Sequence, residues 1–187
     1  MKNNHESNNG NNNNIKIQKN FSFDQPVSAL IPHYLENGDG TNGTLIILSD
    51  GEQIFEPKTF KTSLNRMMAA HGKTLSLTTE KSNNILGTQH VMPPIYTEYT
   101  RVFVPVRMRE PEGKKDGAYG YFCINDVELL PGKKDYARVY FENSSLEMKS
   151  RQKLESASRY CYLGFRLLKH NYKKLQEIQQ ESEIPFL

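Results

Sequence analysis

The chain has 187 residues, a formal net charge of +3 and 36% hydrophobic residues, which suits one domain with a sizeable core. It holds no apolar run near 18 residues, and its Asn-rich start lacks an apolar segment, so neither a transmembrane span nor a secretory signal is expected. Two cysteines do not make a disulfide framework in a chain of this length. Cys123 and Cys161 lie in apolar surroundings, so we expect free buried thiols and a cytoplasmic protein.

The first part of the chain predicts a leader followed by short strands. Residues 1–20 are rich in Asn and offer little apolar surface to bury, so we expect a disordered leader. Alternation, β-branched content and flanking turn residues then predict strands at 21–23, 27–31, 44–48 and 52–55.

One short helix is predicted near the centre, over residues 62–70. Phe60, Leu64, Met67 and Met68 have the spacing of one buried face, and His71-Gly72 ends the helix. The sequence on either side of Gly87 reads as strand-rich, with strands expected at 73–79, 95–108, 119–124, 127–130, 136–141 and 146–149. Pro105, inside one of these runs, indicates an edge position or a bulge.

The longest predicted element is an amphipathic helix over residues 150–175, with Ser150 as its N-cap. The face expected to pack on the core consists of Leu154, Ala157, Cys161, Phe165, Leu168, Tyr172 and Leu175. The neighbouring stripe consists of Arg159, Tyr162, Arg166, Lys169 and Lys173. Seven Lys or Arg stand against one acid in this segment, so the stripe is either an ordinary solvated face or a surface for a polyanion.

Together these elements predict an α+β fold: a mostly antiparallel β body with a short central helix and a long C-terminal α-helix. Residues 21–175 are expected to form one DNA-binding domain, followed by an acidic flexible tail at 176–187. Residues 1–94 hold eight cations and eight acids, whereas residues 95–175 hold sixteen cations and ten acids. The candidate DNA-binding residues of this basic part are Arg107, Arg109, Lys114 and Lys115 on one hairpin, Lys133, Lys134 and Arg138 on the next, and Arg159, Arg166, Lys169 and Lys173 on the helix.

Catalytic motifs are absent from the sequence. The five histidines form no HExxH or zinc spacing, and there is no Cys-x-x-Cys, G-x-S-x-G or Walker motif. The glycine cluster at 38–43 lacks the Lys-Ser or Lys-Thr that would reach a phosphate. We therefore expect no enzyme, no cofactor and no metal site, while a Cys123 nucleophile with His90 stays open because such groups meet in space.

A series of short motifs runs in a characteristic order between residues 21 and 175. They are the early strand closed by Pro32, the helix and its exit from Ser63 to Lys73, Pro93-Pro94-Ile95 followed by Val102-Phe103-Val104-Pro105, the segment Ile124-Asn125-Asp126-Val127, and the hairpin around Val139 to Asn143. In this order and spacing the chain resembles the competence transcription factor (ComK) family. It departs from that family in having no Trp, with Cys123 in the mid-chain position, and in its Asn-rich leader.

The resemblance implies a sequence-specific activator of competence (DNA-uptake) genes that binds AT-rich duplex from the minor groove as a homodimer or tetramer. It also implies a nucleoid location, RNA polymerase as a partner, and an adaptor that delivers the protein to an ATP-dependent protease. Residues 176–187 are then either the handle for that adaptor or an unfolded end.

Two alternatives remain from the residues themselves. One is a binder of single-stranded DNA or RNA, which would use Tyr119, Tyr121, Tyr136 or Tyr140 as stacking platforms. The other is a protein-interaction domain that binds no nucleic acid.

Overall fold

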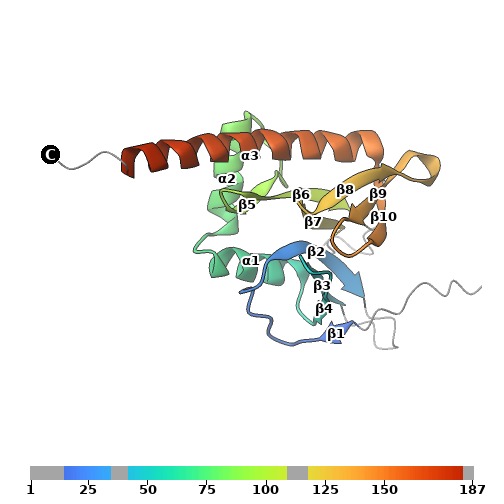
Figure 1. Ribbon diagram of the computed structural model, residues 1–187. Helices are drawn as coiled ribbons and strands as arrows, with labels where there is room; N and C mark the ends of the chain where they lie inside the picture. Colours follow the sequence, from blue (N-terminus) through green and yellow to red (C-terminus); the bar gives the residue numbers. More distant parts are fainter. Residues whose placement is uncertain (1–14, 35–41, 109–117, 183–187) are drawn as a thin grey trace, which may run out of the picture.

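A computed structural model describes residues 15–34, 42–108 and 118–182 of the chain, and the predicted α+β class is confirmed (Figure 1). The larger sheet has the strand order β1 (Lys16–Ile17), β4 (Gln53–Glu56), β3 (Asn42–Leu48), β2 (Val27–Tyr34), β7 (Tyr119–Cys123), β6 (Arg101–Arg107) and β5 (Ile95–Glu98). The smaller sheet has the order β10 (Leu146–Lys153), β9 (Tyr136–Phe141) and β8 (Val127–Pro131), with the short 3-10 turn η1 (Lys133–Asp135) between β8 and β9. The helices are α1 (Phe60–Ala70), α2 (Leu75–Leu86) and α3 (Leu154–Ser182). All strand pairs are antiparallel except β1 with β4.

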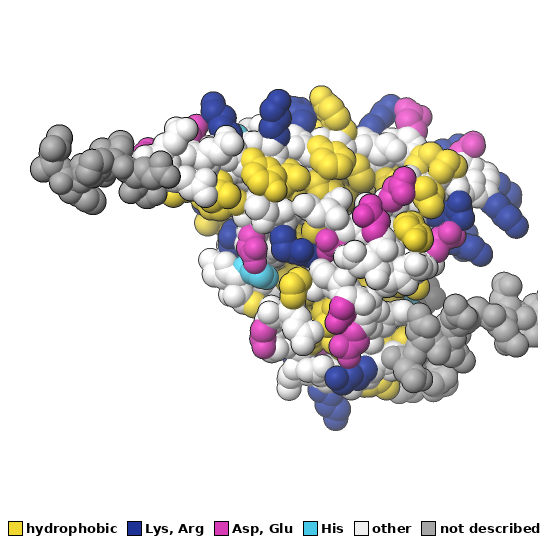
Figure 2. All heavy atoms as spheres, in the orientation of Figure 1, with side chains coloured by type: hydrophobic (Ala, Val, Ile, Leu, Met, Phe, Trp, Pro, Cys, Tyr) yellow, Lys and Arg dark blue, Asp and Glu magenta, His cyan; other side chains and the backbone are white. Residues whose placement is uncertain are grey.

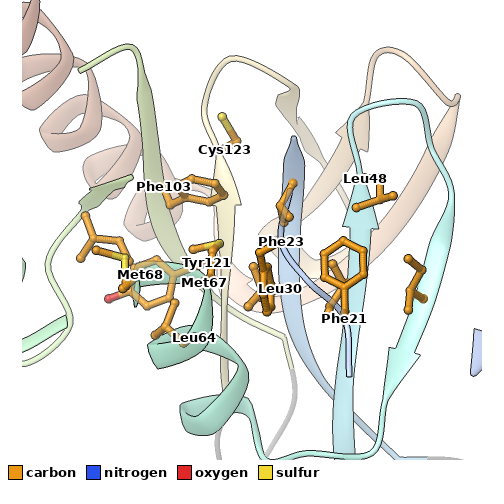
Figure 3. Packing of buried hydrophobic residues seen from close by; sticks show 14 residues of the cluster. Phe21, Phe23, Leu30, Leu48, Leu64, Met67, Met68, Phe103, Tyr121 and Cys123 are labelled. Carbon is orange, nitrogen blue, oxygen red and sulfur yellow. The ribbon is translucent and has the colours of Figure 1, made fainter. Parts of the chain in front are cut away.

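One face of the larger sheet packs against α1. Leu64, Met67 and Met68 of this helix are buried against sheet residues that include Leu30 and Phe103 (Figure 3). The predicted helix is confirmed, and it begins after the N-cap Thr59, whose hydroxyl accepts from the Thr62 N–H. This cluster is the largest body of apolar contacts and anchors the N-terminal half of the fold.

The opposite face of the same sheet is covered by the smaller sheet and by α3. Ala29 and Ile47 pack with Val139 and Phe141 of β9, whereas β6 packs against the long helix. Helix α2 runs beside the edge strand β5 and reaches α3, as Figure 1 shows. Because both faces are covered, the central strands are continuous apolar runs rather than alternating ones.

Two polar clusters connect these layers. In the first, the Oδ2 of Asp126 accepts from the hydroxyls of Ser28 at 2.6 Å and Ser49 at 3.1 Å, and from Arg101 Nη2 at 2.8 Å. Arg101 also donates to the carbonyl of Val27 at 2.7 Å. Since Asp126 lies in the turn between β7 and β8, this cluster fixes where the chain leaves the larger sheet for the smaller one.

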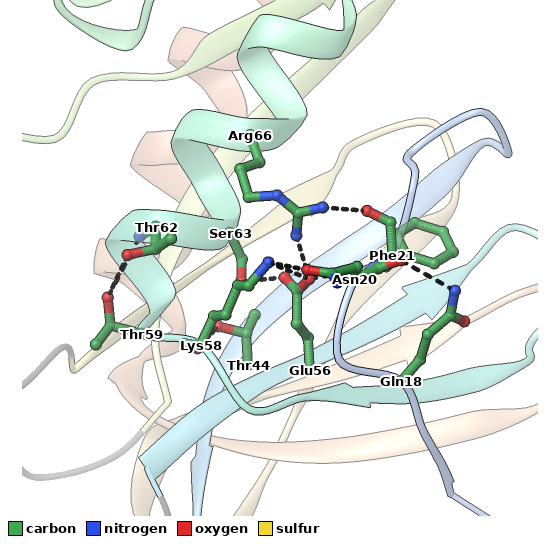
Figure 4. A network of polar contacts seen from close by, with 10 residues as sticks. All are labelled: Gln18, Asn20, Phe21, Thr44, Glu56, Lys58, Thr59, Thr62, Ser63 and Arg66. Carbon is green, nitrogen blue, oxygen red and sulfur yellow. Dashed lines mark hydrogen bonds and ion pairs between the residues drawn. The ribbon is translucent and has the colours of Figure 1, made fainter.

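The second cluster surrounds Glu56, whose side chain is fully buried (Figure 4). Its carboxylate accepts from the Phe21 N–H at 3.1 Å and from Ser63 Oγ at 2.6 Å, and it forms an ion pair with Arg66. Arg66 in turn donates to the Phe21 carbonyl at 2.7 Å. The cluster thereby joins the N-terminal segment, β4 and α1.

The core face of helix α3 overlaps the predicted one, because Cys161 and Leu168 also pack against the core, but it is turned away from two of the predicted residues. Ala157, Gly164 and Leu167 are buried, whereas Phe165 is 56% and Tyr172 is 44% exposed. The cause is the small residue at 164: a Cβ placed there would lie 2.5 Å from Val104 Cγ1. The helix therefore lies close to β6 on its small residues, and the larger aromatic rings point to its flank.

Three other predictions for the chain before residue 109 were wrong. Residues 73–79, predicted as a strand, begin α2, because Thr74 caps the helix and Gly87 ends it in the left-handed conformation. Residues 21–23 form no strand, since Phe21 and Phe23 pack as side chains into the core instead. The stretch 95–108 is a hairpin of β5 and β6 rather than one strand.

Pro105 lies in β6, which is an inner strand by sheet order. The pairing of β5 with β6 ends at Ile95 and Phe103, so β5 does not reach Pro105. At this position β6 is therefore an edge on the β5 side, where a proline is tolerated.

The predicted boundaries differ at both ends. The short strand β1 lies within the expected leader, where Lys16 and Ile17 pair with β4. Ser150 is no N-cap, because β10 continues to Lys153 and the helix begins at Leu154. The helix then extends to Ser182, through most of the expected flexible tail. Residues 1–14 of the leader and 183–187 of the tail lie outside the described residues.

Within the described ranges, no helix has the length and apolar character needed to cross a membrane.

The close contact at Gly164 predicts that replacing this glycine with alanine lowers the stability of the protein, which is the opposite of the usual effect in a helix. Gly to Ala in an exposed helix adds about 1 kcal/mol of stability. Here the new methyl group meets the stiff, buried Val104, so we expect Gly164→Ala to lower the free energy of unfolding by about 1–3 kcal/mol in urea denaturation. Ser158→Ala, on the exposed side of the same helix, is the control and should not destabilise. Unchanged or higher stability of Gly164→Ala would contradict this packing.

The Glu56 cluster predicts a large cost for removing its main partner. Arg66→Met leaves the buried carboxylate its two hydrogen bonds from Phe21 and Ser63, but its remaining cationic partner among the described residues is Lys58, whose Nζ lies 3.7 Å away. Breaking a buried ion pair from one side costs about 3–5 kcal/mol, and we expect about 3 kcal/mol because Arg66 is partly exposed. Lys61→Met, exposed on the same helix, should change the stability by less than about 0.5 kcal/mol. A parent-like melting curve for Arg66→Met would remove Glu56 as an anchor of the fold.

Candidate nucleic-acid interface

The outer surface of α3 carries the predicted cationic stripe. We call Arg159, Arg166, Lys169 and Lys173 the α3 ridge, and all four residues are exposed. Tyr162, 65% exposed, stands in the same row. Figure 2 shows dark blue side chains along the upper edge of α3 and at the end of the molecule where the helix begins. The stripe therefore lies on one continuous outer face of a single rigid helix.

The ridge residues differ in their ion pairs. Arg159 binds Glu155 one turn earlier at 2.6 Å, and Lys173 lies 3.9 Å from Glu177. No carboxylate in the part of the chain that the structure describes lies within ion-pair distance of Arg166 or Lys169. The centre of the ridge is thus the position where an external anion meets the least competition.

A groove runs along the same part of the helix. It has a volume of about 700 Å³ and is lined by Ile85 and Leu86 of α2 together with Arg166, Lys169 and Lys173. His170 adds a titratable ring to this lining. The ridge is therefore bordered by a hollow between two helices rather than by a flat surface.

A second hollow, here called the α3-start cavity, has a volume of about 510 Å³. Four cations line it: Arg107 from the end of β6, Arg151 and Lys153 from the end of β10, and Arg159 from α3. Among the described residues Glu155 is the one acid in the lining, so the described lining has a formal charge of +3. The cavity brings a predicted residue of the first hairpin together with one from the helix.

Gln152 braces this cavity from inside. Its side chain is buried, and its Oε1 accepts from the Arg107 N–H at 2.8 Å while its Nε2 donates to Ser156 Oγ at 3.0 Å. The neighbouring Ser150 hydroxyl accepts from the Gln152 N–H at 3.2 Å. One glutamine therefore holds the ends of β6 and β10 and the first turn of α3 in a fixed arrangement.

Three tyrosines complete the lining: Tyr119, Tyr136 and Tyr160, from β7, β9 and α3. Burial raises the pKa of the Tyr160 hydroxyl, and the nearby Tyr119 raises it further. Tyr121, predicted as a stacking platform, is only 2% exposed and stacks on Phe60 inside the core. Tyr140 is half-buried on the smaller sheet and does not line the cavity.

The second hairpin contributes less to this surface than predicted. Arg138 is engaged within the fold, where Nη1 binds Glu147 at 2.8 Å and Nε donates to the Pro131 carbonyl at 2.8 Å. Lys133 and Lys134 are exposed in the η1 turn. Arg109, Lys114 and Lys115 lie outside the described residues.

The sequence interpretation did not single out Arg151, Lys153 or Gln152. The cations alternate with buried Ser150 and Gln152, a pattern that indicates a strand with one exposed basic face. This strand pattern was missed because residues 150–153 were predicted to begin the long helix, whereas they end β10.

Cys123, considered above as a nucleophile with His90, is fully buried and lines neither hollow of this surface. Burial raises the pKa of the Cys123 thiol to about 11, so it is protonated at neutral pH. The ring of His90 packs against Tyr160, with centroids 5.6 Å apart.

The chemistry of this surface is that of an anion-binding face: an exposed row of cations, a basic cavity and aromatic rings beside it. These features come from residues far apart in the sequence, which meet at α3. Comparisons with known proteins find no matching family model, no matching curated protein and no matching solved structure.

Proposed function

We propose that this chain is a sequence-specific transcriptional activator of competence genes that binds AT-rich duplex DNA through the α3 ridge. The observation that carries the proposal is the exposed row of Arg159, Arg166, Lys169 and Lys173 along one side of a helix packed firmly on the sheet. The motif order that resembles the competence transcription factor family supports the choice of an activator. The gene class rests on that resemblance alone.

The dimensions of the ridge suit a duplex. Residues 159 to 173 span about 21 Å at 1.5 Å per residue. Duplex DNA carries one phosphate charge per about 1.7 Å of axis, so a cationic row of this length meets several phosphates. Neutralising them releases counterions and gives an affinity that falls steeply with salt.

A preference for AT-rich sequence follows from the type of side chain. The minor groove of A-tracts is narrow and strongly negative, and it attracts Arg and Lys side chains. Arg166, exposed and without a carboxylate neighbour among the described residues, is the residue of the ridge best placed to enter such a groove.

We expect binding to an AT-rich duplex to be tighter than to a GC-rich duplex of equal length, and to weaken steeply with salt. Each phosphate contact contributes about −0.9 to the slope of log K against log salt. Arg166→Ala/Lys169→Ala should therefore reduce the slope by about two and weaken binding, as measured by fluorescence anisotropy over a salt series.

The matched control is Lys19→Ala/Lys61→Ala, which removes the same charge from exposed residues outside α3. Its slope should remain that of the parent. Equal affinity for the AT-rich and GC-rich duplexes, or an equal effect of the two double variants, would reduce the ridge to an ordinary basic surface. Stronger binding to a single strand would favour the alternative function.

The homo-oligomer implied by the resemblance is part of the same proposal. Phe165 and Tyr172 are both exposed and lie two turns apart on one side of α3, so they form an apolar flank beside the ridge. We infer that this flank contacts a second copy of the chain, which would place two ridges on one DNA molecule.

Sedimentation equilibrium tests this contact. The parent chain should form dimers, and Phe165→Glu/Tyr172→Glu should shift it to monomers because two charges enter an apolar contact. Leu77→Glu, a change at a 50% exposed residue on α2, is the control and should leave the dimer intact. A monomeric parent, or a double variant that still dimerises, would exclude this flank as the interface.

A further inference from the structure

The α3-start cavity has the volume of a small-molecule site. Its volume of about 510 Å³ falls within the range of about 300–1,000 Å³ found for ligand pockets. Its walls come from four strands and a helix, and Gln152 fixes three of these elements against one another. The cavity is therefore formed before any ligand arrives, which lowers the entropy cost of binding.

The charge of the cavity selects an anion. Arg151 and Lys153 are exposed at their outer ends and line the cavity, and within the described ranges no carboxylate forms an ion pair with either. Glu155, the one acid among the described lining residues, is bound by Arg159 at 2.6 Å. The first turn of α3 also lies in the wall, and the dipole of a helix favours negative charge near its N-terminus. A phosphate group matches this arrangement better than a carboxylate, because it accepts from several cations at once.

The aromatic part of the lining selects a flat ring. Tyr136 is 37% exposed, and Tyr119 and Tyr160 are half-buried, so their rings are reachable from the cavity without unfolding. Stacking of a base on an aromatic side chain contributes about 1–3 kcal/mol and tolerates any base. Few ligand classes combine a phosphate with a flat ring at this size.

We propose that the α3-start cavity binds a nucleotide, with its phosphate on Arg151 and Lys153 and its base against Tyr136. The site is separate from the α3 ridge except for Arg159, and its ligand is one nucleotide rather than a duplex. The same chemistry serves a free mononucleotide or the terminal nucleotide of a single strand. This inference does not depend on duplex binding.

Calorimetric titration of the full chain with adenosine 5′-monophosphate tests the proposal. Adenosine and inorganic phosphate are the two partial probes, each of which supplies one half of the recognition. The monophosphate should bind at least about tenfold more tightly than either, because phosphate and base contacts act together. Failure of the monophosphate to bind, or affinity no better than that of phosphate alone, would overturn the proposal.

Two variants separate the halves of the site. Arg151→Ala/Lys153→Ala should weaken the monophosphate by about tenfold or more, whereas Lys149→Ala, exposed on the same strand but outside the cavity, should not. Tyr136→Ala should weaken the monophosphate by about tenfold and leave inorganic phosphate unchanged. Tyr162→Ala, an exposed tyrosine on α3 outside this cavity, is its control. Equal effects of variant and control in either pair would contradict the assignment.

The natural source of the nucleotide is decided by competition. A 5′-phosphorylated single-stranded decamer that displaces the monophosphate, and does so less well with Arg151→Ala/Lys153→Ala, supports the end of a strand as the ligand. A decamer that does not compete supports a free nucleotide. The ridge variant Arg166→Ala/Lys169→Ala should leave the affinity for the monophosphate unchanged. If this variant no longer binds the monophosphate, the ridge and the cavity form one binding surface and the proposed separate site is wrong.

Discussion

The close approach of α3 to β6 is the constraint on which the whole binding surface depends. Gly164 allows the helix backbone to lie against Val104, and Ala157, two turns earlier, is also fully buried. This packing decides which residues point away from the core, and the cations of the ridge are among them. It also brings the first turn of α3 next to the end of β6, where the Gln152 side chain spans the distance between them. Both the ridge and the α3-start cavity depend on this close contact between Gly164 and Val104.

The buried charges of the fold have a different role. Asp126 and Glu56 each gather several donors from distant parts of the chain, and neither lines the binding surface. A buried carboxylate is tolerated only where its partners are fixed, so these two residues specify where segments meet rather than supply the driving force for folding. The apolar clusters on the two faces of the sheet supply that force.

The sequence predicts those parts of the fold that local chemistry dictates. Hairpins around 49–51 and 142–145, the helix containing Met67 and Met68, and the exposed cationic stripe all follow from spacing and turn residues. The orientation of α3 does not follow, because hydrophobic periodicity counts Phe165 and Tyr172 as core and cannot register that Gly164 packs closest to the sheet. The sequence could not predict the cavity either. Its lining residues come from elements between β6 and α3, and these elements meet only because of the order of the strands in the two sheets.

The involvement of the N-terminal segment has a practical consequence for how the folded unit is delimited. Lys16 and Ile17 extend the larger sheet, Gln18 donates its N–H to Phe55, and the backbone of Phe21 supplies both a donor to Glu56 and an acceptor for Arg66. A fragment cut at residue 21 would lose the edge strand and place a new charged amine beside a buried ion pair. A piece that retains these contacts therefore includes Lys16 to Phe21, several residues upstream of where the apolar pattern begins.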